Sequence, residues 1–67
     1  MNTKTVIDYL KSKGYGKEEI KLKCGIHKNT YIDWDKNNAE MRFKTAIHIF
    51  TTLNLSFREF LRINNIK

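Results

Sequence analysis

The sequence predicts an all-α protein built from five short helices in a single domain. The 67 residues contain no Pro and only three Gly, a composition that favours helices. Apolar residues recur three and four positions apart in several segments, which is the period of an amphipathic helix. A chain of this length forms one domain at most and buries a small core. We therefore expect residues 1–67 to fold as one unit.

The first expected helix covers residues 5–13. Thr5 is a suitable N-cap because its hydroxyl can accept a hydrogen bond from the first turn. Residues 1–4 then lie outside the helix, and Gly14 stands where a glycine commonly ends a helix. The inner side of this helix is formed by Val6, Ile7, Tyr9 and Leu10.

The second and third helices are expected on either side of Gly25. Residues 17–24 begin with a lysine and two glutamates. Acidic groups in the first turn of a helix interact favourably with the helix dipole. Gly25 tolerates the positive φ that a tight turn requires. The third helix is expected to begin after His27 and to continue to about Lys36.

The pair Asn37 and Asn38 predicts a loop, because asparagine tolerates the left-handed conformation. A fourth helix is expected over residues 42–53. Its wide apolar stripe is formed by Phe43, Ala46, Ile47, Ile49, Phe50 and Leu53. Ser56 is a plausible cap for the fifth helix, and Glu59 three residues later would complete a capping box.

The segment 17–34 has the spacing of a helix-turn-helix. Gly25 lies at the pivot, and apolar residues at helical spacing on both sides can fill the corner between two crossing helices. These residues are Ile20 and Cys24 before the turn, then Ile26, Tyr31 and Trp34 after it. The second helix of such a motif commonly lies in the DNA major groove.

The formal net charge is +6 and the sequence pI is near 9.7. This charge favours an anionic partner, and nucleic acid is the first candidate. The alternative is that the lysines only solvate helix faces. One cysteine, Cys24, excludes an internal disulfide and a Cys-based zinc site. Neither His27 nor His48 has partners at ligand spacing, and no nucleophile–base constellation is evident. We expect no metal, no cofactor and no enzymatic activity.

Two blocks of sequence resemble the lambda-repressor-like, Cro/CI-type helix-turn-helix family. One comprises Gly25-Ile26, Thr30-Tyr31 and Trp34-Asp35. The other is Leu53-Asn54-Leu55-Ser56-Phe57-Arg58-Glu59-Phe60, which is similar to the ending of that family's domain. The resemblance extends from about Val6 to Leu61. It implies a lambda-repressor-like domain of five helices, in which helices two and three form the helix-turn-helix.

Four residues depart from the family's pattern. Lys21 stands where the family has a small alanine at the helix crossing, and its methylene stem must reach outward. Leu10 replaces an arginine that commonly pairs with the acidic group at the Asp35 position. Lys17 replaces a glutamine that often binds phosphate. Asp33 would repel a phosphate, although it can accept a hydrogen bond from a cytosine amino group.

The resemblance places a set of residues against DNA. Lys28 would contact guanine, Asn29 would pair with adenine, and Ile32 would meet a thymine methyl. Lys17 would lie near a phosphate at the start of the second helix. The full expected DNA-binding set is Lys17, His27, Lys28, Asn29, Ile32, Asp33, Lys36, Asn37 and Asn38. The alternative for each is a solvated surface position.

The chain end carries more apolar residues than a small core can bury, so Leu61 and Ile66 are the expected exposed partner interface. The favoured function is a Cro/repressor-type transcription regulator that would bind double-stranded DNA as a homodimer. The alternative is an antirepressor that binds another regulator, such as a repressor protein, through the same fold. No segment is apolar enough to span a membrane, and no signal-peptide pattern is present. We expect a cytoplasmic protein of a bacterial or phage-infected cell.

Overall fold

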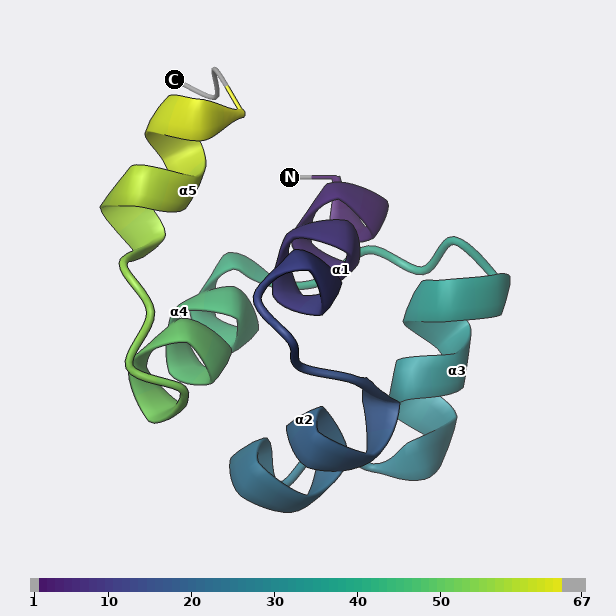
Figure 1. Cartoon of the computed structure of the whole chain (residues 1–67). Helices are drawn as coiled ribbons and strands as arrows, with labels where there is room; N and C mark the ends of the chain where they lie inside the picture. The colour runs from purple at the N-terminus through teal and green to yellow at the C-terminus, as the bar shows by residue number, and fades with distance from the viewer. Residues whose placement is uncertain (1, 65–67) are drawn as a thin grey trace.

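The computed structural model describes residues 2–64, and that part of the chain contains five α-helices and no β-strand. The helices are α1 (Thr3–Ser12), α2 (Lys17–Cys24), α3 (Lys28–Lys36), α4 (Phe43–Thr52) and α5 (Phe57–Ile63). The all-α prediction is confirmed. Figure 1 shows the helices coloured by residue number, with short connections between them.

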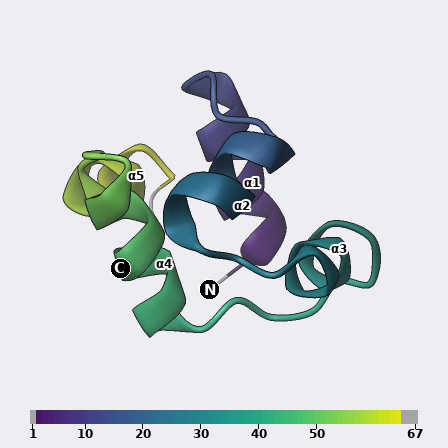
Figure 2. The ribbon, with the colours of Figure 1, turned by 90° about the horizontal axis from the view of Figure 1, so that it is seen from below.

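The helices pack in a pattern that does not follow chain order. α1 contacts α3, while α2 contacts both α3 and α4, and α5 packs on α4. In two perpendicular views α3 lies on one side of the molecule and α5 on the other (Figures 1 and 2). The surfaces of α3 and α5 are therefore separate.

α1 begins two residues earlier than the sequence predicted. The side chain of Asn2 accepts a hydrogen bond from the Thr5 backbone N–H at 3.2 Å, so Asn2 and not Thr5 is the N-cap. Thr3 is buried, and its hydroxyl oxygen accepts a hydrogen bond from the Met41 N–H at 2.7 Å. The prediction was wrong because Asn2, three residues before Thr5, is the local cap. The bond of Thr3 to Met41, 38 residues away, adds a tertiary contact that the sequence does not show. The helix ends near the predicted position, with Gly14 at φ +90°.

The remaining helix boundaries agree closely with the predicted ones. Asn38 and Asn54 adopt φ values of 54° and 57°, which places left-handed residues in the two expected connections. The Ser56 hydroxyl accepts a hydrogen bond from the Glu59 N–H at 3.1 Å and caps α5 as expected. The Glu59 carboxylate lies 4.0 Å from Arg62.

The core is assembled from α1 to α5 and the loop before α4. Its largest feature is an aromatic cluster in which the rings of Tyr9, Phe50 and Phe60 lie within 5.7 Å of one another, centroid to centroid. The buried apolar residues are Val6, Ile7, Tyr9, Leu10, Ile20, Cys24, Tyr31, Trp34, Met41, Ala46, Ile49, Phe50, Leu53 and Phe60. Every helix contributes to this one core, as a domain of this size requires.

Two apolar surfaces differ from the sequence expectation. Leu61 is half-buried and packs against the core instead of lying exposed, and Ile63 is the exposed apolar residue of α5. Ile66 lies outside the described residues. On α4, the predicted stripe is wider than the core can cover, because Phe43 and Ile47 remain exposed.

The hydrogen bond between Thr3 and Met41 generates a stability prediction. In Thr3→Val the side chain keeps its shape but loses the acceptor, and the buried Met41 N–H is left without a partner. We expect unfolding to become easier by about 1–3 kcal/mol, measured by chemical denaturation. Thr51→Val, at an exposed position of α4, is the matched control and should change stability little. Equal effects from both substitutions would contradict a structural role for the bond.

Candidate nucleic-acid interface

The connection between α2 and α3 is only three residues long and depends on a left-handed glycine. Gly25 adopts φ 68° and ψ 32°. This conformation lets the Ile26 N–H donate to the Lys21 carbonyl at 3.1 Å, the 6→1 bond of a Schellman motif. Ile26 then packs against the core. The turn therefore changes the direction of the chain while the Lys21 carbonyl near the end of α2 stays hydrogen-bonded.

Lys21 and Lys17 occupy the positions on α2 where the chain departs from the family pattern. The Lys21 stem is largely covered, and its ammonium lies 3.0 Å from the Glu18 carboxylate. Its charge thus reaches the surface at the crossing of α2 with its neighbours. Lys17 is exposed at the first position of α2, where backbone N–H groups are also unpaired.

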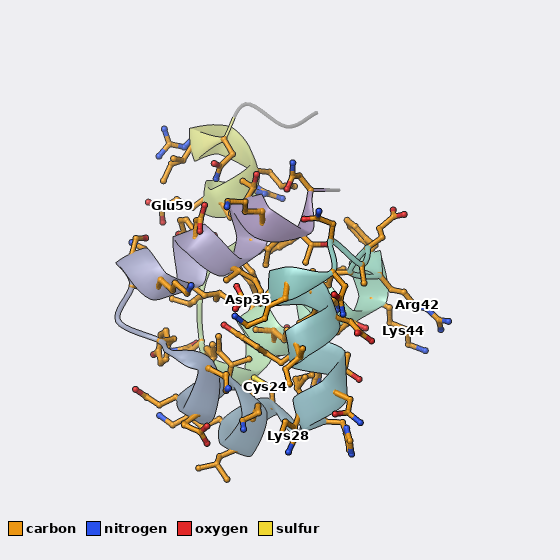
Figure 3. All side chains as sticks on the ribbon, turned by 90° about the vertical axis from the view of Figure 1, so that its right-hand side faces the viewer. Cys24, Lys28, Asp35, Arg42, Lys44 and Glu59 are labelled. Carbon is orange, nitrogen blue, oxygen red and sulfur yellow. The ribbon has the colours of Figure 1, made fainter. Side chains whose placement is uncertain are left out.

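The start of α3 is organised by His27. Its Nδ1 accepts a hydrogen bond from the Asn29 backbone N–H at 3.1 Å, so the imidazole is the N-cap of the helix. Lys28 and Asn29 follow on the first turn, and both are exposed. In Figure 3 the Lys28 side chain projects from the beginning of α3.

One face of α3 is fixed in the core by two aromatic residues. Tyr31 is 1% exposed and Trp34 is 6% exposed, and their ring centroids are 6.1 Å apart. Their spacing of three residues places them on the same side of the helix. Ile32 is half-buried. The remaining side chains of α3 face solvent: Lys28, Asn29, Thr30, Asp33, Asp35 and Lys36.

Asp33 accepts the hydrogen bonds that hold the C-terminal end of α3 and the loop after it. The Asp33 carboxylate accepts a hydrogen bond from the Asn37 side chain at 2.9 Å. Its backbone carbonyl accepts hydrogen bonds from the N–H groups of Asn37 and Ala39. Two of the expected DNA-binding residues, Asp33 and Asn37, are therefore bonded to each other. Lys36 and Asn38 are exposed beside them.

The positive charge of the protein is concentrated outside α3. Residues 28–40 hold two lysines and three acidic residues, a net charge of −1. Residues 2–25 hold six lysines against three acidic residues, and residues 41–64 hold four basic residues against one acidic residue, a net charge of +3 each. An anion approaching α3 would be attracted chiefly by the flanking helices.

A hollow of about 400 Å³ lies between α3 and the beginning of α4. It is lined by Thr30, Asp33, Trp34, Ala39, Glu40, Arg42 and Thr45. Arg42 was not among the residues expected from the sequence. The available signal was its position as the first residue of the fourth expected helix. Figure 3 shows Arg42 and Lys44 projecting together from this end of α4.

The cysteine and the second histidine have structural surroundings. Cys24 is buried, and burial raises the pKa of its thiol, which disfavours the reactive thiolate. His48 Nε2 lies 2.9 Å from the Cys24 carbonyl oxygen and connects α4 with the end of α2. Among residues 2–64, no three His, Cys, Asp or Glu side chains gather as a metal-binding group. In the same residues no helix is long and apolar enough to cross a membrane.

The burial of Trp34 generates a second stability prediction. Trp34→Ala should lower the free energy of unfolding by about 3–5 kcal/mol, because it removes a large buried side chain and leaves a cavity. That loss is most of the stability of a domain this small. A thermal melt followed by circular dichroism measures the effect. A melting temperature close to that of the wild type would show that Trp34 does not hold α3 in place.

Tyr31 generates a prediction of opposite sign. Its hydroxyl is buried without a hydrogen-bond partner among the described residues, so Tyr31→Phe should stabilise the fold by up to about 1 kcal/mol. Tyr15→Phe, at a half-buried position, is the control and should be nearly neutral. Loss of stability in Tyr31→Phe would contradict an unpaired hydroxyl.

The same residue predicts a pH dependence. Burial, with a smaller contribution from Asp35, raises the pKa of the Tyr31 phenol above its ordinary value of 10.0. The unfolded chain therefore releases this proton first, and wild-type stability declines as the pH rises above about 10. Tyr31→Phe lacks this loss, so its advantage over the wild type should widen between pH 9 and pH 11 in denaturant titrations. A constant difference over this range would contradict the raised pKa.

Comparison with known proteins gave no match: no protein-family model, no curated protein and no solved structure matches this chain. The functional interpretation therefore depends on the residues and the geometry described above.

Proposed function

We propose that this protein is a sequence-specific DNA-binding transcription regulator of the Cro/repressor type. In this proposal α2 and α3 are the helix-turn-helix of a lambda-repressor-like domain. The observation that carries the proposal is the arrangement of α3. Tyr31 and Trp34 bury one face of this helix, and the left-handed turn at Gly25 connects it to α2. The opposite face of α3 is then free to enter a major groove.

The proposed readout divides the exposed residues into two groups. Lys28 and Asn29, on the first turn of α3, contact base edges, with Lys28 suited to guanine and Asn29 to adenine. Lys17 contacts a phosphate at the N-terminal end of α2, where the helix dipole adds to its charge. In the same proposal Lys36 contacts the DNA backbone beyond the groove.

The proposed mechanism is repression by occupancy. A dimer would bind two half-sites about one helical turn apart and exclude polymerase from the promoter. It requires no cofactor. Such a regulator would act in the cytoplasm of a bacterial or phage-infected cell.

The charge distribution favours a second candidate function, an antirepressor or modulator that binds another regulator. The segment containing α3 has a net charge of −1, and Asp33 is held in place by Asn37 on the face expected to meet DNA. An acidic group there opposes phosphate binding but suits a basic protein surface. A salt titration with random duplex DNA separates the two functions. A steep loss of affinity with salt indicates phosphate contacts, whereas no binding at low salt favours the protein partner.

The DNA-binding proposal predicts different effects for two substitutions. Selection from a random duplex library identifies the preferred site, and fluorescence anisotropy then measures affinity. Asn29→Ala should weaken that site by about 1–3 kcal/mol and relax preference at one base pair. Lys17→Ala should weaken all duplexes alike and lower the salt slope by about one.

Lys11→Ala, at an exposed position of α1, is the control for a general loss of positive charge. It should have less effect than Lys17→Ala. If Asn29→Ala and Lys17→Ala both leave DNA affinity unchanged, α3 and the start of α2 do not form the DNA interface.

A further inference from the structure

A second surface combines one exposed and one partly buried aromatic side chain with positive charge at the junction of α4 and α5. We name it the aromatic–basic surface. It consists of three apolar residues and of the three basic residues that are their neighbours in sequence. These are Phe43, Ile47 and Phe57, together with Arg42, Lys44 and Arg58. Phe43 is 58% exposed and Ile47 is 39% exposed. Their spacing of four residues places them on one face of α4.

The exposed ring of Phe43 is held in place by the core. It packs edge-to-face against Phe57, with centroids 5.4 Å apart. Phe57 in turn packs edge-to-face against Phe50 at 5.1 Å, and Phe50 is buried. A chain of aromatic contacts therefore extends from the core to the surface. An aromatic side chain ordered in advance loses little conformational entropy on binding, which is the property of an interface anchor.

The residues next to these rings in sequence are mainly basic, although Glu59 follows Arg58 and Glu40 lies two residues before Arg42. Arg42 and Lys44 flank Phe43 in sequence, and Arg58 follows Phe57. α4 contains no acidic residue. The ion pairs found within residues 2–64 involve Lys21, Lys23 and Arg62, so none of the three basic residues of this surface is neutralised by them. The side chains of Arg42 and Lys44 project outward from the beginning of α4 (Figure 3).

We infer that the aromatic–basic surface is a docking site for an acidic amphipathic helix of a partner protein. The apolar face of such a helix would cover Phe43 and Ile47, and its carboxylates would meet the three basic residues. A second copy of this chain fits less well. A two-fold axis through the surface would set Arg42, Lys44 and Arg58 against their own equivalents, and like charges across an interface are unfavourable.

This inference is independent of the proposed DNA contacts, because it uses α4 and the beginning of α5 instead of the exposed face of α3. The failure of either proposal in its own experiment therefore leaves the other standing.

The test uses the whole chain labelled with nitrogen-15 and a synthetic helical peptide as the probe. The peptide carries leucine at the spacing of one helix face and glutamate on both flanks. A matched peptide has lysine in place of every glutamate. Isothermal titration calorimetry gives the affinity, and amide chemical shifts locate the site. We expect the acidic peptide to bind, the basic peptide to bind at least roughly tenfold more weakly, which corresponds to about 1.4 kcal/mol, and the shifts to centre on α4 and the start of α5.

Variants separate the apolar and the charged contributions. Phe43→Ala should weaken the acidic peptide by roughly tenfold or more, as expected for an interface anchor. The double variant Lys44→Glu/Arg58→Glu changes only exposed residues, so it preserves the fold, and it should abolish the preference for the acidic peptide. Leu22→Ala is the apolar control. Leu22 is 81% exposed on α2, outside this surface, and its replacement should leave peptide affinity unchanged.

Four results would overturn the inference. The first is equal affinity for the acidic and basic peptides, and the second is binding that Phe43→Ala does not weaken. The third is a chain that sediments as a dimer and is dissociated by Phe43→Ala, which would assign the surface to a second copy. The fourth is tighter binding to vesicles containing phosphatidylglycerol than to the acidic peptide, lost in Lys44→Glu/Arg58→Glu, which would assign the surface to a membrane.

Discussion

The burial of Tyr31 and Trp34 is the interaction on which the arrangement of α3 depends. α3 has nine residues, and a helix this short is marginal in water without tertiary packing. The two rings hold it against the core, and α1 is its principal helical neighbour. Because both rings lie on one side, the opposite side of α3 has a fixed orientation relative to α2. The Tyr31 hydroxyl has no hydrogen-bond partner within residues 2–64, which indicates that shape, more than hydrogen bonding, determines this packing.

Contacts between residues far apart in sequence hold the other helices around α3. The Thr3 hydroxyl connects the start of α1 with the loop before α4 through the Met41 N–H. His48 connects α4 with the last carbonyl of α2. Each contact satisfies a polar backbone group near a helix end or in a loop. In a core this small, such groups would otherwise lower the free energy of unfolding.

The net charge differs between segments of the chain. The segment 28–40 has a net charge of −1, while the flanking segments hold the positive charge. α3 and α5 lie on opposite sides of the molecule (Figures 1 and 2). The total of +6 is therefore a poor guide to where an anion would bind. It is compatible with DNA contacts along α2 and α3, and also with an acidic partner on α4 and α5.

The sequence by itself determined the helices, because their signals are local. Gly25 and Asn38 favour left-handed turns because of their own residue types, and Ser56 caps α5 through a residue three positions away. The core aromatics Tyr31 and Trp34 were predicted for the same reason, since helical spacing places them on one face. The start of α1 is capped locally by Asn2, and only the tertiary structure pairs Thr3 with Met41, because the two residues are 38 positions apart. The tertiary structure also decided which apolar side chains remain exposed. Helical periodicity does not show how much of an apolar stripe the neighbouring helices cover. For this reason the sequence did not predict that Phe43 is exposed or that Leu61 packs against the core.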